Sequence, residues 1–238
     1  MKILGLDSSG LVASVAIVED QELVAEYTTN YKKTHSQTLL PMLEELRKMV
    51  ELDLETVDAV AIASGPGSFT GLRIGSATAK GLGLALGKPL VEVPTLEGLA
   101  WNLCGTDRVV CPLMDARRNQ VYTAAYELRD EKENFRLHAL IPQRPVDIRE
   151  MLDSLAQLGR PVIFLGDGVP VYRKEIQSRT DLQYTFAPAG NNRQRAASIA
   201  ALGAVYYAEG KIVSAAEHRP EYLRQSQAEQ EAKSRDDT

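Results

Sequence analysis

The feature that most constrains the fold of this chain is a glycine-rich junction, GPGSFTG, at residues 65–71. Just before it, residues 57–63 are mostly β-branched residues and alanines, which predicts a buried strand. Within the junction glycine permits positive φ, proline fixes its own φ, and Ser68 or Thr70 can cap a helix that we expect over about residues 70–86. The order of strand, glycine loop and helix indicates an α/β fold.

This junction has the composition of a phosphate-binding loop but not its defining end. A Walker A loop finishes on Gly-Lys-Ser or Gly-Lys-Thr, whose lysine reaches the phosphates, and no such sequence follows residue 71. We therefore exclude a P-loop nucleotide site.

Two other turns have the composition of anion sites. Backbone amides of Asp7-Ser8-Ser9-Gly10, after the first apolar run, or of Gly166-Asp167-Gly168, before a later helix, could converge on a phosphate. Each could equally be an ordinary tight turn, with Asp167 as a helix cap. Both interpretations remain open.

Small residues recur along the helix that follows the junction. Gly71, Gly75, Ala79 and Gly83 are four residues apart and therefore lie on one helical face. Glycine inside a helix costs about 1 kcal/mol relative to alanine, so a close contact must offset that cost. Either the chain's own sheet or a helix of a partner protein could supply the contact.

The N-terminal part predicts one lobe. An antiparallel meander is indicated by strand-like stretches at residues 3–7, 12–18 and 22–30. The period then becomes helical over about residues 36–51, with an apolar stripe of Leu39, Leu43, Leu46 and Val50. A further strand is expected at residues 90–93, and Thr95 is placed to cap the next helix.

The C-terminal part repeats this order loosely. Strands are expected at residues 109–114, 120–127, 135–141 and 162–165, and helices at about 147–157, 169–178 and 195–208. We therefore expect two lobes, residues 1–103 and 104–224, and a tail over 225–238 that is too polar to bury itself.

The turn between the first two strands of the second lobe, residues 115–120, carries two adjacent arginines. Arg117 and Arg118 could contact phosphate or an RNA strand, or could belong to a solvated basic turn. No glycine occurs in this turn, and bulky side chains hinder the close approach of a nucleotide to the backbone.

Charge and composition exclude several classes of function. Twenty-seven basic against 32 acidic side chains give a net charge of -5, which argues against a free-standing nucleic-acid binder. The three histidines are far apart and the two cysteines lack CxxC spacing, so we expect no metal site and no catalytic residue. No export signal and no run of about 20 apolar residues is visible, which predicts a cytoplasmic protein without membrane contact.

Several motifs, in this order along the chain, resemble the bacterial TsaB (YeaZ) family. They are residues 3–9, Thr34-His35-Ser36-Gln37 with Leu40-Pro41, residues 65–75, Asp115-Ala116-Arg117-Arg118, and residues 220–224. The resemblance covers nearly the whole chain, and the glycine junction is its most specific part. It implies the two-lobed fold shared by actin, sugar kinases and the Hsp70 ATPase domain, with mixed sheets flanked by helices.

The resemblance also implies a function in tRNA modification. It implies a subunit that pairs with a TsaD-type paralogue and, with a TsaE-type ATPase, places threonylcarbamoyl on the adenosine beside the tRNA anticodon, so that the chain meets tRNA indirectly. The first two helices would form the partner interface, and the same surface could form a homodimer when the chain is alone. We expect that interface at Leu39, Leu43, Leu46, Val50, Gly71, Leu72, Gly75, Ala79 and Gly83.

Two departures indicate that catalysis belongs to the partner. TsaD-like proteins bind a metal through two histidines spaced four apart, and this chain has no such pair. The second lobe's turn lacks the glycines of working ATPases, so we expect no stable ATP binding by the isolated chain. The alternative is an autonomous enzyme, either an ATP-dependent kinase-like protein or a glycoprotease-like peptidase.

Overall fold

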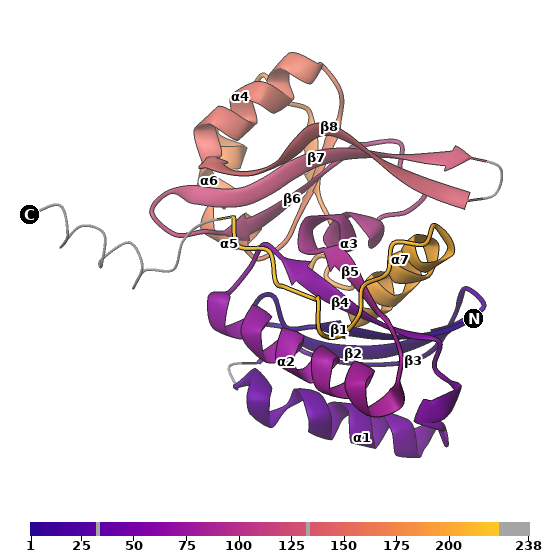
Figure 1. The fold of residues 1–238 in the computed structure, drawn as a ribbon. Coiled ribbons are helices and arrows are strands. Elements are labelled where there is room, and N and C mark those ends of the chain that lie inside the picture. The colour runs from indigo at the N-terminus through magenta and orange to yellow at the C-terminus, as the bar shows by residue number, and fades with distance from the viewer. Residues whose placement is uncertain (32–33, 132–133, 224–238) are drawn as a thin grey trace, which may run out of the picture.

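The computed structural model describes residues 1–31, 34–131 and 134–223, which form two lobes, each built on a mixed five-stranded sheet (Figure 1). The elements are β1 (Lys2–Asp7), β2 (Ala13–Glu19), β3 (Glu22–Thr29), α1 (Leu39–Met49), β4 (Ala59–Gly65), α2 (Phe69–Leu86), β5 (Leu90–Pro94), α3 (Thr95–Trp101), β6 (Val109–Asp115), β7 (Gln120–Glu131), β8 (Asn134–Asp147), α4 (Ile148–Leu158), β9 (Val162–Leu165), α5 (Gly168–Val171), α6 (Arg173–Gln177), β10 (Tyr184–Phe186) and α7 (Ala196–Ala208). The expected α/β architecture is confirmed. The tail at 225–238, and Arg224 before it, lie outside the described residues.

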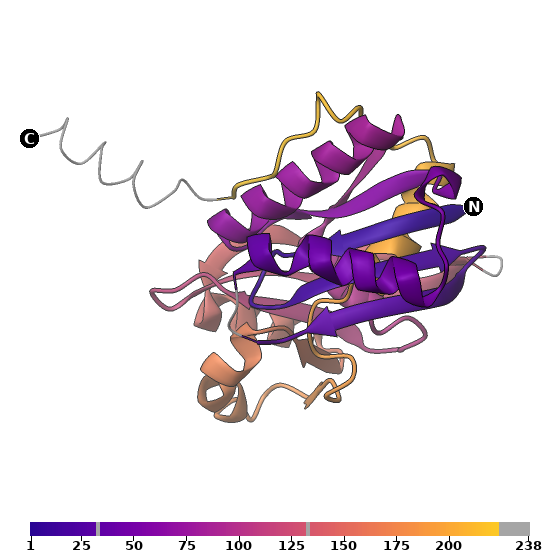
Figure 2. The same ribbon diagram turned by 90° about the horizontal axis from the view of Figure 1, so that it is seen from below.

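The first sheet has the strand order β3-β2-β1-β4-β5. The first three strands pair antiparallel, as the meander predicts, while β4 and β5 run parallel to β1. The helices α1 and α2 lie side by side across one face, and α3 and α7 cover the other (Figures 1 and 2). Because helices cover both faces, β1 and β4 are apolar along nearly their whole length.

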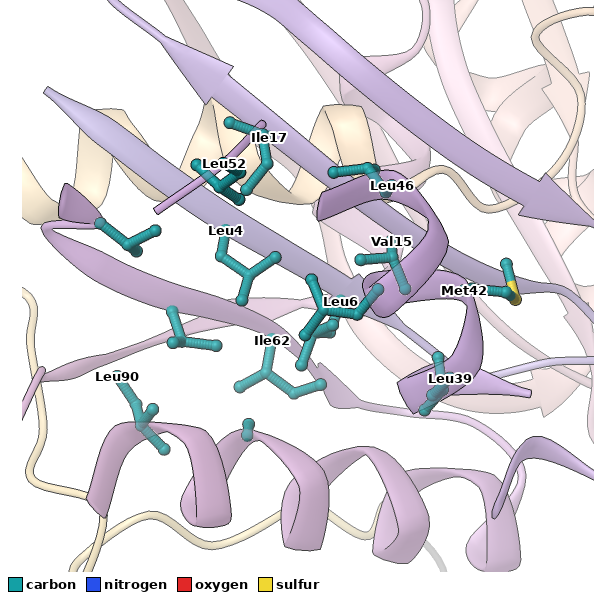
Figure 3. Packing of buried hydrophobic residues seen from close by; sticks show 14 of the residues in the cluster. Leu4, Leu6, Val15, Ile17, Leu39, Met42, Leu46, Leu52, Ile62 and Leu90 are labelled. Atoms are coloured by element: carbon teal, nitrogen blue, oxygen red, sulfur yellow. The ribbon is translucent and has the colours of Figure 1, made fainter. Parts of the chain in front are cut away.

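A leucine-rich core joins this sheet to α1 and α2 (Figure 3). The strands contribute Leu4, Leu6, Val15, Ile17 and Ile62, and α1 contributes Leu39, Met42, Leu43 and Leu46. Each of these side chains is at most 5% exposed. Burying one leucine or isoleucine stabilises the fold by about 1.5–3 kcal/mol, so this layer is a principal source of the first lobe's stability.

The last helix returns to the first lobe, and this corrects the expected lobe boundaries. We expected residues 104–224 to form the second lobe, but Ile199, Ala200 and Leu202 of α7 pack against β1, β4 and β5. Beyond α7, Val213 pairs with Leu90 at the start of β5. The face of the first sheet that α1 and α2 leave open is apolar, and α7 supplies most of its cover.

The second sheet repeats the first. Its order, β8-β7-β6-β9-β10, matches β3-β2-β1-β4-β5 strand for strand, with the same antiparallel and parallel pairs. One face packs against α4 and α6. The other packs against α3, where Leu96 and Leu99 meet Val110 and Tyr126. The loose repeat in the sequence therefore reflects one topology used twice, with α3 between the two copies.

Two elements of the second lobe differ from expectation. The helix expected at 169–178 is interrupted at Tyr172, which ends α5 with φ -103° and whose hydroxyl donates to the backbone oxygen of Gln120, 3.2 Å away. The strand expected at 135–141 extends to Asp147, because its pairing with β7 continues past two register shifts. The strand β10 was not predicted, since three residues carry too little periodicity.

Two predicted caps differ in outcome. The Ser68 hydroxyl accepts the Gly71 N–H at 3.3 Å and caps α2, as predicted. The prediction for Thr95 was wrong, because Thr95 is the first residue of α3 and its hydroxyl accepts the Gly65 N–H across the sheet edge at 3.2 Å.

In the part of the chain that the structure describes, no helix is both long and apolar enough to cross a bilayer.

Candidate functional site: the cleft between the lobes

A cleft of about 670 Å³ opens where the carboxyl ends of the central strands of both sheets face each other. The lining residues come from six segments that are distant in sequence. They are Ser9, Gly10 and Leu11; His35; Gly67, Ser68, Phe69 and Thr70; Met114, Asp115, Ala116, Arg117 and Tyr122; Asp167; and Glu221, Tyr222 and Leu223. The repeated topology places corresponding turns of the two lobes on opposite walls.

The turn after β1 is held by its own side chains. The carboxylate of Asp7 accepts the backbone N–H of Ser9 at 2.8 Å and the Ser9 hydroxyl at 2.7 Å. The Ser8 hydroxyl donates to the Gly71 carbonyl at 2.9 Å. Both hydroxyls are therefore engaged within the chain, and only Ser9 and Gly10 reach the cleft.

Two carboxyl groups lie at these turns, with Asp7 buried beneath the cleft and the half-buried Asp167 lining it. Burial raises the pKa of Asp7 to about 6, although the hydrogen bonds from Ser9 oppose the shift and the charge of Asp167 adds to it. Burial also raises the pKa of Asp167, while backbone N–H groups and the Arg193 guanidinium lower it. The negative charges of these two groups disfavour a bare phosphate, so the electrostatics do not support the predicted anion contact at these turns.

The second turn follows β9 and is built for packing. A Cβ atom at residue 166 would clash with the Leu113 carbonyl, and one at residue 168 would lie 3.1 Å from the same backbone. Gly166 also has a φ of +103°, a conformation that glycine adopts without strain. Asp167 makes no capping bond to α5, so the predicted cap was wrong, and its Oδ1 atom has no hydrogen-bond partner among the described residues.

The turn between β6 and β7 forms part of the opposite wall. The Gln120 N–H donates to the Arg117 carbonyl at 3.0 Å, and the two central residues, Arg118 and Asn119, have φ of +54° and +59°. Positive φ at both positions is what a type I′ hairpin turn requires, and asparagine and glycine suit it best. Arg117 also has positive φ, at +62°. A left-handed conformation costs a residue such as arginine about 1–2 kcal/mol, so this turn is locally strained.

A C-terminal strap, which we define as residues 211–223, completes the cleft. It runs from α7 past β5 and α2, and its N–H at Glu221 donates to the Ser64 carbonyl at 2.7 Å. Tyr222 then stacks on Phe69 with ring centroids 4.9 Å apart, and the guanidinium of Arg73 lies 4.1 Å above the same ring. The sequence alone does not predict this contact, because the proline, glutamate and tyrosine at residues 220–222 show no periodicity that points to it.

The histidine beside the cleft has a structural contact. The Nε2 atom of His35 lies 2.8 Å from the Gly10 carbonyl, so it donates a hydrogen bond that fixes the turn after β1. The other two histidines are elsewhere, with His138 beside Glu131 and His218 buried beside Glu92. Among residues 1–31, 34–131 and 134–223, no three His, Cys, Asp or Glu side chains are grouped so that they could hold a metal ion.

The residues predicted as the partner interface lie in the core of the first lobe, which corrects that prediction. Side chains of the α1 stripe are at most 4% exposed except for the half-buried Val50, and Leu72 and Ala79 are at most 2% exposed. Any Cβ added at Gly71 or Gly75 would collide with Ser8, and one at Gly83 would lie 2.9 Å from Leu90. The small-residue ridge thus packs onto the chain's own sheet, the alternative that the sequence left open.

The outward sides of the same helices carry a second row of small residues. Ala77, Gly81 and Ala85 of α2 are exposed, are four residues apart, and Gly81 has no heavy atom within 4 Å of where its Cβ would lie. Leu84 beside them is 69% exposed, and Met49 at the end of α1 is 84% exposed. A helix of another protein could approach the α2 backbone closely along this row.

Comparison with known proteins agrees with this architecture. The family model for TsaD, described as tRNA N6-adenosine threonylcarbamoyltransferase, matches residues 22–232. The tRNA threonylcarbamoyladenosine biosynthesis protein TsaB of Bacillus subtilis is 32% identical, and that of Escherichia coli is 30% identical, each alignment covering 96% of both chains. The solved structure of YeaZ from Pseudomonas aeruginosa is 25% identical, with a TM-score of 0.73 over 93% of this chain and 99% of that one. A second Pseudomonas aeruginosa structure, of an uncharacterized protein with similarity to peptidase YEAZ, is 26% identical, with a TM-score of 0.78 over 94% and 99%.

Proposed function

The chain belongs to the TsaB family of tRNA threonylcarbamoyladenosine biosynthesis proteins, and on that premise we propose that it is a non-catalytic subunit that binds and supports a TsaD-type paralogue. Together with a TsaE-type ATPase, the pair would modify the adenosine beside the anticodon. At physiological salt the tRNA would meet this chain within that assembly, because the chain's net charge of -5 disfavours binding of RNA by the chain alone.

The observation that carries the proposal is the outward face of α2. Leu84 is 69% exposed there, beside the exposed row of Ala77, Gly81 and Ala85, which permits close helix contact. Leu40 and Met49 of the neighbouring helix α1 are also exposed, at 53% and 84%, on different sides of that helix. An apolar face with small residues at its centre fits a partner built on the same fold, and the same face could pair with itself when the paralogue is absent.

The chemistry of the cleft supports a non-catalytic role. Ser9 donates to the Asp7 carboxylate, Ser68 caps α2, and His35 donates to a backbone carbonyl, so these residues form no serine–histidine pair of the kind that activates a nucleophile. The strained β6–β7 turn brings arginine side chains where a nucleotide would need bare backbone. We propose that the isolated chain binds no ATP stably and that partners supply ATP use to the assembly.

Association with the paralogue is the first test. Ala77→Arg and Leu84→Glu, on the outward face of α2, should weaken binding to a TsaD-type protein at least tenfold by calorimetry or co-elution. Val171→Glu is the matched control, since Val171 is 55% exposed but lies in the second lobe. These positions are exposed, so the variants should unfold like the wild type. Undiminished binding by both folded variants would contradict the proposed interface.

Two further measurements separate this proposal from an autonomous enzyme. Depleting the protein should lower threonylcarbamoyladenosine in bulk tRNA, and unchanged levels would contradict a role in the modification. The purified chain should neither bind ATP measurably nor phosphorylate sugars or cleave peptides. Turnover by the chain alone, lost on changing Asp7 or Asp167, would favour a kinase-like or peptidase-like enzyme instead.

A further inference from the structure

One end of the second lobe concentrates unpaired positive charge, although the chain as a whole is acidic. This basic end comprises the exposed side chains of Arg117, Arg118, Arg149, Arg173 and Lys174. None of them forms an ion pair with a residue that the structure describes. Their segments touch, because the N–H of Ile148 donates to the Asn119 carbonyl at 3.3 Å and the Tyr172 hydroxyl donates to the Gln120 carbonyl at 3.2 Å.

Of the acidic side chains at this end, Asp115 and Asp147 hold backbone N–H groups and Glu175 is half-buried. Asp115 accepts the backbone N–H of Arg117 at 2.9 Å, and Asp147 accepts that of Arg149 at 2.8 Å. Glu150 lies 3.3 Å from the guanidinium of Arg144, outside the basic end. The Arg173 guanidinium lies 4.1 Å above the ring of Phe186, whereas those of Arg117, Arg118 and Arg149 remain available to a ligand and present planar sets of donors that match phosphate oxygens.

The conformation of the β6–β7 turn adds a second, independent observation. Three consecutive residues, Arg117, Arg118 and Asn119, have positive φ although none is glycine. Glycine would relieve the strain at the two arginines, and strain that persists in a rigidly held turn is typical of binding sites. The turn is rigidly held, since Asp115, Gln120 and Tyr172 anchor both of its ends.

The basic end also lies at the mouth of the cleft. Arg117 lines the cleft opposite Ser68 and Phe69 at the start of α2, and Figure 1 shows α5 and α6 beside the β6–β7 turn. The exposed row on α2 begins two turns further along the same helix. A polymer held by a partner seated on α2 would therefore pass close to these arginines.

We propose that the basic end contacts the phosphate backbone of tRNA. The inference rests on the proposed function, which brings tRNA to the assembly, and it assigns this chain a direct contact with the substrate. The contact is electrostatic and independent of base sequence. RNA is favoured over an acidic protein because the five cations come from three separate segments and surround a strained turn, which suits a bent row of phosphates.

The experiment compares two double variants of equal charge. Arg117→Gln with Arg118→Gln alters the basic end, while Arg129→Gln with Arg136→Gln alters paired arginines of β7 and β8 near the far hairpin. Binding of an unmodified, labelled tRNA transcript is measured over a salt series, for the full chain alone at low salt and for its complex with a TsaD-type protein. Association of each variant with that protein is measured separately.

The first variant should bind tRNA about tenfold more weakly, with a salt dependence of log K shallower by about 1 to 2, since each lost phosphate contact removes roughly 0.7–0.9 from the slope. The second variant should match the wild type. If the first variant binds tRNA with unchanged affinity and salt slope, both alone and in the complex, the inference is overturned. Normal association of that variant with the TsaD-type protein would leave the proposed function intact. Weaker pairing with unchanged tRNA binding would also overturn it and assign the basic end to a protein partner. If the wild-type chain itself does not associate with the TsaD-type protein, the proposed function is refuted. The measurement of tRNA binding by the chain alone then decides the inference.

Discussion

The hydroxyl of Ser8, at the end of the first strand, donates a 2.9 Å hydrogen bond to the carbonyl of Gly71 in the first turn of α2. The two residues approach so closely that a Cβ at residue 71 would collide with the Ser8 carbonyl oxygen. The turn after β1 and the first turns of α2 are therefore in direct contact. Gly71 and Gly75 of the small-residue ridge make room for Ser8 there.

Replacing Gly71 by alanine should destabilise the chain by about 1–3 kcal/mol, because backbone must shift to admit the methyl group. Urea denaturation measures the change. Gly81→Ala is the control in the same helix, since nothing lies within 4 Å of its Cβ position, and it should stabilise the chain by up to about 1 kcal/mol. Equal effects of the two changes would show that the ridge is not packed as described.

The sequence predicted most of the fold because its periodicities are strong and local. The stripe from Leu39 to Val50 identified α1, and the alternation of strands and turns identified both sheets. It could not decide which neighbour the ridge on α2 meets, because the neighbour, Ser8, is 63 residues away from Gly71. Helical spacing fixes which residues share a face, and tertiary structure decides what that face contacts.

The candidate site was only partly predictable for the same reason. The glycine junction and the β6–β7 turn were identified by composition, and both line the cleft. The strap was assigned no role, although Tyr222 meets Phe69 there, because this contact joins segments from opposite ends of the chain. The return of α7 to the first lobe was missed because a uniformly apolar helix fits either lobe.

The buried carboxyl of Asp7 predicts a definite dependence of stability on pH. Its pKa is near 3.8 in the unfolded chain and about 6 in the folded one, so the folded state holds the proton more tightly. The stability that this group contributes is complete below pH 3.8 and is lost as the pH rises through 6. Replacement by asparagine removes the charge but keeps an oxygen that accepts both bonds from Ser9.

Asp7→Asn should therefore be more stable than the wild type at pH 7.5, by up to about 3 kcal/mol, and the advantage should shrink toward pH 4. Chemical denaturation at several pH values measures it. Asp167→Asn provides a second check, because removing the Asp167 charge lowers the pKa of Asp7 and moves the transition to lower pH. A stability difference that does not change with pH would contradict the prediction.

A buried histidine anchors the strap. The Nδ1 atom of His218, a residue only 1% exposed, lies 2.6 Å from the Glu92 carboxylate on β5, which also accepts the N–H of Arg219 at 3.2 Å. His218→Ala should cost about 1–3 kcal/mol and expose the strap, because a hydrogen bond to a charged group is lost. Hydrogen exchange should rise across residues 213–223 and little elsewhere. Glu92→Gln keeps an acceptor for Nδ1–H and should have the smaller effect, and equal protection in His218→Ala and wild type would refute the anchoring role.

The strain of the β6–β7 turn gives a prediction in which stability and binding move in opposite directions. Changing Arg118 to asparagine and Asn119 to glycine places the Asn-Gly pair that a type I′ turn favours at the two residues with φ of +54° and +59°. Relieving a left-handed arginine should stabilise the chain by about 1 kcal/mol. The same change removes one guanidinium from the basic end, so tRNA binding by the complex should weaken severalfold.

Thermal denaturation and the salt series measure the two effects on one protein. Asn119→Gly alone, which keeps both arginines, should gain stability without losing tRNA affinity, and a loss of affinity in that variant would show that the turn's shape, rather than its charge, makes the contact.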